Sequence, residues 1–182
     1  MIRKLLYLCT DNTDPYHNLA LEQYLTDTVP ADTCILYLWQ NRHTVVIGRN
    51  QNAWQECRTA LLEQDGGKLS RRLSGGGAVY HDLGNLNYSF ITDAGELQEL
   101  AMQRFTAPVV EALKGLGLNA EASGRNDILV EGRKVSGTAQ RVSHGRILHH
   151  GTLLFDSDPS AVAGALNVDP TKFQSKASKS VR

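Results

Sequence analysis

The segment Arg71-Arg72-Leu73-Ser74-Gly75-Gly76-Gly77 places two cations and a hydroxyl group directly before three consecutive glycines. Glycines leave no side chain between the backbone and a ligand, so their N–H groups can approach an anion closely. The residues that follow, Ala78-Val79-Tyr80-His81-Asp82, begin with a strand signal. An anion cradle and a plain hairpin turn both fit this pattern. Neither a G-x-G-x-x-G motif nor a Gly-Lys-Ser/Thr motif is present, so the common nucleotide fingerprints do not apply.

Lys134 stands in a second cluster of small and polar residues, Gly132-Arg133-Lys134-Val135-Ser136-Gly137-Thr138-Ala139-Gln140. It follows a turn and enters a predicted strand, so one of the two alternating sets of side chains should point inward. An inward ammonium ion needs an anionic partner, because a desolvated and unpaired charge is strongly unfavourable. A solvated lysine beside a turn is the alternative that position alone allows.

Two further clusters combine small residues with polar ones, Gly124-Arg125-Asn126-Asp127 and Leu148-His149-His150-Gly151-Thr152. Adjacent residues of a strand face opposite sides of a sheet. We therefore expect only one of the two histidines to line a pocket, and histidine ligation of a metal is not favoured. Nucleophilic catalysis is not favoured either, because Ser74 lacks a G-x-S-x-G elbow and no cysteine follows Cys57.

Periodicity predicts the elements that must position these clusters. Asp14 is a predicted N-cap with Pro15 at the first helical position, and Ser157 or Asp158 caps the last helix. Helices are expected at 15–28, across 54–62 as one helix ending at Gly66-Gly67, at 97–116 with Pro108 inside it, and at 159–167. Strands are expected at 2–8, 34–40, 44–47, 69–72, 78–81, 85–91, 120–123, 127–130, 134–142 and 147–155. Hairpins are expected at 41–43 and around the triple glycine, and further turns are expected at 131–133 and 143–146.

This order of elements predicts an α+β fold. Strands dominate the middle of the chain and helices fall between groups of them, so the sheet should be mixed or largely antiparallel, with packed helices. We expect one folded domain over residues 1–170. Residues 171–182 hold four basic residues, no acidic one and few large apolar ones, which indicates a mobile basic loop or tail.

The composition describes one ordinary globular domain. The chain has 182 residues, 41% of them hydrophobic, and 19 basic residues balance 19 acidic ones. Because this balance supplies no field for a polyanion, nucleic acid is not an expected partner. Cys9, Cys34 and Cys57 are interpreted as buried thiols, which favours a reducing compartment. With no export signal or membrane span in the sequence, a cytoplasmic location is expected and a membrane partner is not.

Taken together and in order, the clusters resemble the lipoate-protein ligases of the biotin/lipoate ligase superfamily. The resemblance is carried by 71–82, Gly84-Asn85, 124–128, 132–140 and 149–153, and so it spans nearly the whole chain. The ending Ser178-Lys179-Ser180-Val181-Arg182 is similar to part of a loop that closes over the bound intermediate in these ligases. The resemblance implies the catalytic-domain fold of that superfamily, and it makes Lys134 the site lysine.

The resemblance also implies roles for individual residues. Lys134 would touch both the lipoate carboxyl oxygen and the α-phosphate oxygen. Asn126 and Asp127 would face the nucleotide phosphate, with Asp127 as a magnesium ligand. The remaining residues implied to bind lipoate, ATP or lipoyl-AMP are small or polar: Arg72, Ser74, Gly75, Gly76, Gly77, Ala78, Val79, His81, Gly137, Ala139, and His149 or His150.

The implied reaction has two halves. Lipoate attacks the α-phosphate of ATP to give lipoyl-AMP and pyrophosphate, and a lysine of a carrier domain then takes the lipoyl group and releases AMP. ATP and Mg²⁺ would be co-substrate and ion, with no tightly bound prosthetic group. The implied partners are apo lipoyl domains of 2-oxoacid dehydrogenase acyltransferase subunits and the glycine-cleavage H protein.

Three alternatives remain beside this interpretation. Octanoyl transferases are similar around the lysine, but they use a cysteine placed after it, and this sequence has none there. Biotin ligases carry a G-R-G-R-x-G pattern that the sequence lacks. Lipoate-protein ligases normally continue past this length, so a truncated fragment that binds lipoyl-AMP without full turnover is the third alternative.

Overall fold

The computed structural model describes residues 2–94, 102–124 and 126–166. Its larger sheet has seven strands in the order β1-β2-β6-β10-β9-β8-β7. Neighbouring strands run antiparallel except β1 and β2, which are parallel. This confirms the predicted α+β fold with a mixed, largely antiparallel sheet. The strands are β1 (Lys4–Cys9), β2 (Thr33–Trp39), β6 (Asn85–Asp93), β7 (Ala120–Ser123), β8 (Asp127–Val130), β9 (Arg133–Ser143) and β10 (Arg146–Leu154).

A smaller sheet carries the triple glycine. It has the order β4-β3-β5, with β3 (Thr44–Ile47) parallel to β4 (Lys68–Arg71) and antiparallel to β5 (Val79–His81). Both predicted hairpins are wrong. The 41–43 link carries the chain from one sheet to the other, and β4 and β5 lie on opposite edges of β3. The triple glycine therefore crosses the end of β3 instead of closing a two-stranded turn.

Five helices are described, α1 (Pro15–Thr28), α2 (Ala53–Glu56), α3 (Thr59–Gln64), α4 (Met102–Gly115) and α5 (Pro159–Ala165). The predicted caps are confirmed at Asp14 and at Asp158. The single helix expected after residue 53 is wrong. Cys57 is extended, with φ −141° and ψ 156°, and it forms a β-bridge to Leu166, so α2 and α3 are separate. Pro108 lies inside α4 without dividing it.

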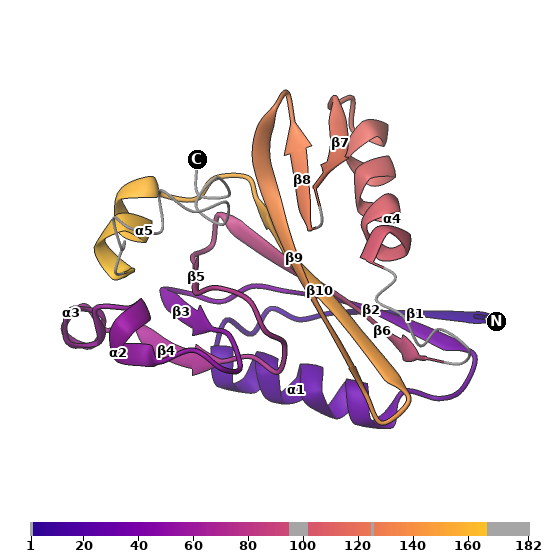
Figure 1. Ribbon diagram of the computed structural model, residues 1–182, viewed down its shortest axis with the longest axis horizontal. Coiled ribbons are helices and arrows are strands. Elements are labelled where there is room, and N and C mark those ends of the chain that lie inside the picture. Colours follow the sequence, from indigo (N-terminus) through magenta and orange to yellow (C-terminus); the bar gives the residue numbers. More distant parts are fainter. Residues whose placement is uncertain (1, 95–101, 125, 167–182) are drawn as a thin grey trace.

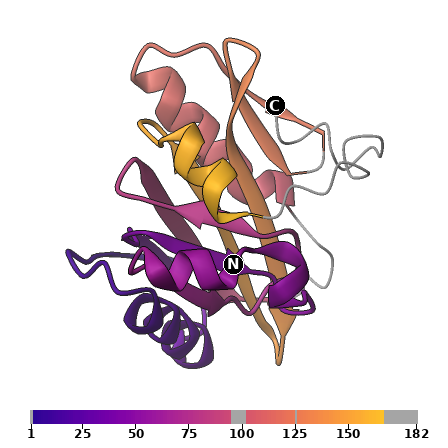
Figure 2. The same cartoon turned by 90° about the vertical axis from the view of Figure 1, so that its left-hand side faces the viewer.

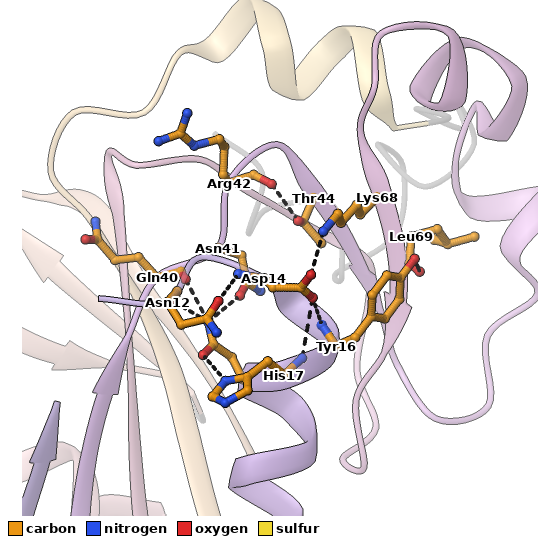
Figure 3. A network of polar contacts seen from close by, with 11 residues as sticks. Asn12, Asp14, Tyr16, His17, Gln40, Asn41, Arg42, Thr44, Lys68 and Leu69 are labelled. Atoms are coloured by element: carbon orange, nitrogen blue, oxygen red, sulfur yellow. Dashed lines mark hydrogen bonds and ion pairs between the residues drawn. The ribbon is translucent and has the colours of Figure 1, made fainter. Parts of the chain in front are cut away.

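The start of α1 is fastened to the strand that leads into the triple glycine (Figure 3). One Asp14 carboxylate oxygen accepts hydrogen bonds from the backbone N–H groups of Tyr16 and His17, and the other pairs with Lys68 Nζ at 2.7 Å. The hydrogen bond from Lys68, followed by the one from Tyr16, lowers the pKa of Asp14. The Tyr16 hydroxyl donates to the Leu69 carbonyl, so helix and strand are joined at two points.

The large sheet has helices on both faces. In both views α4 lies above and α1 below, with the long β9–β10 hairpin between them (Figures 1 and 2). On the α4 face, Val110, Leu113 and Ile128 form one apolar cluster. On the α1 face, Ile35, Ile91 and Leu148 form another, with further members Val29, Leu25 and Leu73. The α5 helix packs on the small sheet, in a third cluster.

The remaining predictions concern the cysteines, a membrane span and the segments at 97–116 and 171–182. Cys34 and Cys57 are buried, as expected, but Cys9 is exposed because β1 is an edge strand with most of its residues open to solvent. Among the described residues, no helix is long and apolar enough to cross a membrane. The first part of the helix expected at 97–116, the basic segment 171–182 and the motif at 178–182 lie outside the described residues.

Candidate functional site

The face of α1 that packs on the large sheet is polar. Asn18, Glu22 and Thr26 are buried at intervals of four residues, whereas Tyr16 and Tyr24 are 56% and 63% exposed. A helix packed on a sheet normally turns its apolar side inward. A fully buried carboxylate needs hydrogen-bond donors or a cation beside it. The inversion in α1 therefore marks this side of the sheet as a candidate functional site.

Glu22 forms a polar contact with His150, which in turn forms one with Ser74. Its Oε1 lies 2.8 Å from His150 Nδ1, and His150 Nε2 lies 2.6 Å from Ser74 Oγ. The same carboxylate oxygen accepts a hydrogen bond from Ser89 Oγ at 2.5 Å, and Trp39 Nε1 donates to Ser89. This buried chain connects α1, β10 and β6 to the residue that precedes the triple glycine.

Arg72 holds the carbonyl groups of the triple-glycine loop. Its guanidinium donates to the Gly75 carbonyl at 2.8 Å, to the Gly77 carbonyl at 2.7 Å and to the Val46 carbonyl at 3.1 Å. Burial lowers its pKa to about 10, so it stays charged at neutral pH. No carboxylate of the described residues forms an ion pair with it. Nor do the N–H groups of Gly75, Gly76 and Gly77 donate to an acceptor within the described part of the chain.

A β-bulge turns Lys134 towards the α1 face. Strand β8 pairs Ile128 with Ser136 and Leu129 with Lys134, so Val135 is the extra residue. Val135 packs with the α4 cluster, and Ser136 bonds Tyr88 on that same face. Without the bulge, Lys134 and Gly137 would be three positions apart and would face opposite ways. With it, they share one face.

Lys134 meets Asp127 on that face. Its Nζ lies 2.8 Å from Asp127 Oδ1, and the two side chains are only 22% and 21% exposed. A Cβ at Gly137 would lie at the ordinary contact distance of 3.6 Å from this Nζ, so the ammonium group lies directly beside the glycine. The turn before Asp127 is fixed because the Asn126 carbonyl accepts the Thr138 N–H at 2.8 Å.

Strand register brings five of the predicted residues together on one face of the large sheet. Asp127, Gly137, Thr152 and Asn87 lie side by side across four strands. The next row on the same face places Ala139 opposite His150 and His150 opposite Ser89. Lys134, Asp127, Gly137, Ala139 and His150 thus share one face with Ser74 beside it. Because aligned residues of neighbouring strands lie close together, this face can bind one extended ligand.

His149 is on the other face. It stacks on Phe105 of α4 at 5.2 Å and contacts Phe90, with Gln140 beside its Nδ1 at 3.3 Å. Burial, and secondarily the charge of His150, lowers its pKa to about 4. Of the two predicted histidines, His150 is therefore the one on the face that carries Lys134.

This environment predicts an acid-sensitive contribution to stability. The pKa of His149 falls from 6.5 in a free side chain to about 4 in the fold, so between these values the unfolded chain binds a proton that the folded one does not. Its contribution is complete above pH 6.5 and is lost as the pH falls towards 4, with a slope of up to about 1.4 kcal/mol per pH unit. Urea denaturation of the parent and of His149→Gln across this range should show a flatter pH dependence in the variant. Equal slopes would contradict the assignment.

The remaining predicted residues lie in and beside β5. His81 is buried, with Asn41 Nδ2 3.1 Å from its Nδ1 and the Trp39 ring beside it. Burial, with the nearby charges of Arg72 and His150, lowers its pKa to about 3, so it is neutral. Val79 pairs with Val46 in the small sheet, and Ala78 packs against the core of that sheet.

Two features of the site were absent from the sequence predictions. Glu22 was not singled out, although its position between Asn18 and Thr26 forms a polar stripe with a four-residue spacing that a helix search could detect. A pocket of about 370 Å³ between α1 and β4 was also not foreseen. Its lining includes Leu19, Leu69 and Leu73, and it reaches Arg72.

Comparison with known proteins identifies the family. The model of the lipoyl protein ligase A/B catalytic domain matches residues 14–182. The chain therefore belongs to this family of ligase catalytic domains, as the motif resemblance predicted.

Individual relatives of the chain are consistent with this family. Lipoate-protein ligase LplJ of Bacillus subtilis is 48% identical over 179 residues, which are 98% of this chain and 54% of LplJ. The chain thus spans about half the length of this curated relative. A bipartite lipoate-protein ligase from Thermoplasma acidophilum, studied with its E2 lipoyl domain, is 28% identical with a TM-score of 0.84, over 98% of this chain and 72% of that one. A lipoate-protein ligase A bound with ATP is 29% identical with a TM-score of 0.80, over 94% and 74% of the two chains.

Proposed function

We propose that this chain is the catalytic domain of an ATP-dependent lipoate-protein ligase. It would activate lipoate as lipoyl-AMP and pass the lipoyl group to a specific lysine of an apo lipoyl domain. The observation that carries the proposal is Lys134, turned by a bulge onto the face that carries His150, whose ring contacts Ser74 directly before the triple glycine. The family and the ATP-bound relative support ATP as co-substrate.

In the first half-reaction, a lipoate carboxylate oxygen forms a bond to the α-phosphorus of ATP while the bond to the β-phosphate oxygen breaks. Pyrophosphate leaves, and lipoyl-AMP remains. Negative charge grows on the α-phosphate oxygens, and a fixed ammonium group at Lys134 stabilises it in a partly dry site. The free N–H groups of Gly76 and Gly77 and the charge of Arg72 favour the same anion.

In the second half-reaction, the amine of the carrier lysine attacks the lipoyl carbonyl carbon. The C–O bond to the phosphate breaks, AMP departs, and the nitrogen loses a proton as the amide forms. Lys134 stabilises the developing oxyanion and the leaving phosphate. The pocket between α1 and β4, where Leu19, Leu69 and Leu73 lie beside polar residues that include Arg72, provides surface for the acyl chain.

The residues present fit a magnesium ion. Mg²⁺ in nucleotide enzymes is usually held by one or two carboxylates together with substrate phosphates, and Asp127 offers one carboxylate beside Lys134. Asn126 supplies a neighbouring amide. When bound, Mg²⁺ would neutralise part of the phosphate charge. Among the described residues, no group of three potential ligands forms a complete protein cage.

The identity of the carrier proteins is also part of the proposal. The relative studied with an E2 lipoyl domain supports carriers of that kind. We include acyltransferase subunits of 2-oxoacid dehydrogenases and the glycine-cleavage H protein, each presenting a lysine. We also propose residues 1–170 as the folded catalytic unit.

Pyrophosphate release tests the activation step. The chain is incubated with Mg-ATP, with or without lipoate, and pyrophosphate is measured by a coupled assay. We expect release that requires lipoate. A parallel reaction with octanoyl thioester and no ATP, followed by mass analysis of a lipoyl domain, tests the transferase alternative. Acyl transfer in that reaction, with no lipoate-dependent pyrophosphate, would contradict the proposal.

A further inference from the structure

The loop of residues 48–51, which follows β3, runs against the triple-glycine loop. The Arg49 N–H donates to the Ser74 carbonyl at 2.9 Å. Within the loop, the Gly48 N–H donates to Gln51 Oε1 at 2.8 Å, and the Gln51 N–H donates to the Gly48 carbonyl at 3.1 Å. The loop is therefore ordered by its own bonds and attached to the residue before the triple glycine.

Gly48 is the point of closest approach. A Cβ built there would lie 2.2 Å from the Gly76 carbonyl oxygen and 3.3 Å from the Gly75 carbonyl carbon. Both obstacles are backbone atoms, which cannot turn aside as a side chain can. The φ of Gly48 is not in the left-handed region, so space and not conformation requires glycine here.

Two adjacent arginines hold the two loops. Arg71 donates to the carbonyls of Gly48 at 3.0 Å, Arg49 at 3.1 Å and Gln51 at 2.7 Å. Arg72, the next residue, holds the carbonyls of the triple glycine. Side chains at successive positions of an extended chain point in opposite directions, so one arginine serves each loop.

These contacts determine the direction of three successive peptide planes. A trans peptide is planar, and its C=O and N–H groups point in opposite directions. The carbonyls of Gly75 and Gly77 face Arg72, and the Gly76 carbonyl faces Gly48. The Gly76 N–H is thereby turned away from Arg72, and the Gly77 N–H is turned away from the 48–51 loop.

We propose that the 48–51 loop is a positioning element of the ligase site, in which Gly48 and Arg71 set the middle peptide plane of the triple glycine and so aim the Gly77 N–H at the bound anion, beside the Gly76 N–H whose plane Arg72 sets. The proposal rests on the proposed function for its consequence in catalysis. Its geometric part stands without it. Misplacing binding donors by about 1 Å can lower a rate by about 10²-fold.

The substitution Gly48→Ala tests the proposal. We expect lipoate-dependent pyrophosphate release to fall by about 10- to 100-fold in kcat/KM, with a raised KM for Mg-ATP, at a temperature where circular dichroism shows the variant fully folded. The matched control is Gly115→Ala at the end of α4, where a Cβ meets nothing within 4 Å and should leave the activity unchanged. A second variant, Arg71→Lys, keeps the positive charge but loses the planar guanidinium that donates to the loop carbonyls. It should give a smaller decrease in kcat/KM.

Backbone amide NMR reports the geometry independently of turnover. The ¹⁵N-labelled Gly48→Ala and Arg71→Lys variants should shift the Gly76 and Gly77 amide resonances, whereas Gly115→Ala should not. If Gly48→Ala does not fold, Arg71→Lys decides the case by the same two measurements. Unmoved glycine resonances, or an unchanged kcat/KM in a folded variant with moved resonances, would overturn the proposal. Absence of pyrophosphate release by the parent chain would instead refute the proposed function, and the resonances would still test the positioning.

Discussion

Lys134→Ala is expected to lower lipoyl transfer by about 10²- to 10³-fold while the protein stays folded. The bulge at Val135 brings this ammonium group to Asp127 and Gly137. In the proposed mechanism, negative charge develops beside it in both half-reactions. Its side chain is 22% exposed and pairs with Asp127, so the rates are compared at a temperature where circular dichroism shows the variant fully folded. Single-turnover formation of lipoyl-AMP and transfer from preformed lipoyl-AMP would measure the two half-reactions separately, and both should slow.

A matched control is available on the far side of the molecule. Lys114 pairs with Glu111 at 3.1 Å on α4, and both side chains are solvent-exposed. Lys114→Ala removes the same chemical pair from a helix surface, where such pairs contribute little. It should turn over at the parent rate. A Lys134→Ala variant with a rate close to that of Lys114→Ala would show that Lys134 is not the site lysine.

Glu22→Ala is expected to destabilise the protein by about 3 kcal/mol, because it leaves His150 and Ser89 without their shared acceptor in a buried site. For a chain of this size, that loss corresponds to a decrease of about 6–12 °C in Tm. Thermal denaturation followed by circular dichroism would measure it. Since His150 also holds Ser74, lipoate binding by the folded fraction should weaken as well.

Glu22→Gln separates charge from hydrogen bonding. The amide oxygen can still accept from His150 or Ser89, so its loss of stability should be smaller than that of alanine. Glu111→Ala, at an exposed carboxylate with one partner, is the control and should change Tm little. A Glu22→Ala protein as stable as the Glu111→Ala protein would mean that the buried chain does not hold the site together.

Local signals in the sequence predicted many elements well. The cap at Asp14 and the turn at 131–133 depend on neighbouring residues, so α1, β8 and the start of β9 were placed within a residue. Which strands pair with each other depends on contacts between residues that are far apart in the sequence. Strand β3 is buried at all four positions, which indicates cover on both faces but does not say which strands pair with it, and the predicted hairpin with β2 was wrong.

The candidate site, too, could be predicted only in part from the sequence. Small residues and a lysine near a turn can be recognised in the sequence, but simple alternation would place Lys134 opposite Gly137. Only the bulge at Val135, a feature of the pairing between two strands, brings them to one face. Glu22 was missed because a helical carboxylate usually indicates a solvated surface. The contact of Gly48 with the Gly76 carbonyl joins segments that are distant in sequence, so no local sequence pattern predicts it.

Intact-mass spectrometry of an apo lipoyl domain tests whether this chain attaches lipoate to a carrier in an ATP-dependent reaction. The domain is incubated with this chain, lipoate and Mg-ATP, and then with each component omitted and with Lys134→Ala in place of the parent. We expect a gain of one lipoyl group that requires both lipoate and ATP and is lost in the variant. An unmodified lipoyl domain in the complete reaction, or a gain that persists without ATP, would contradict it.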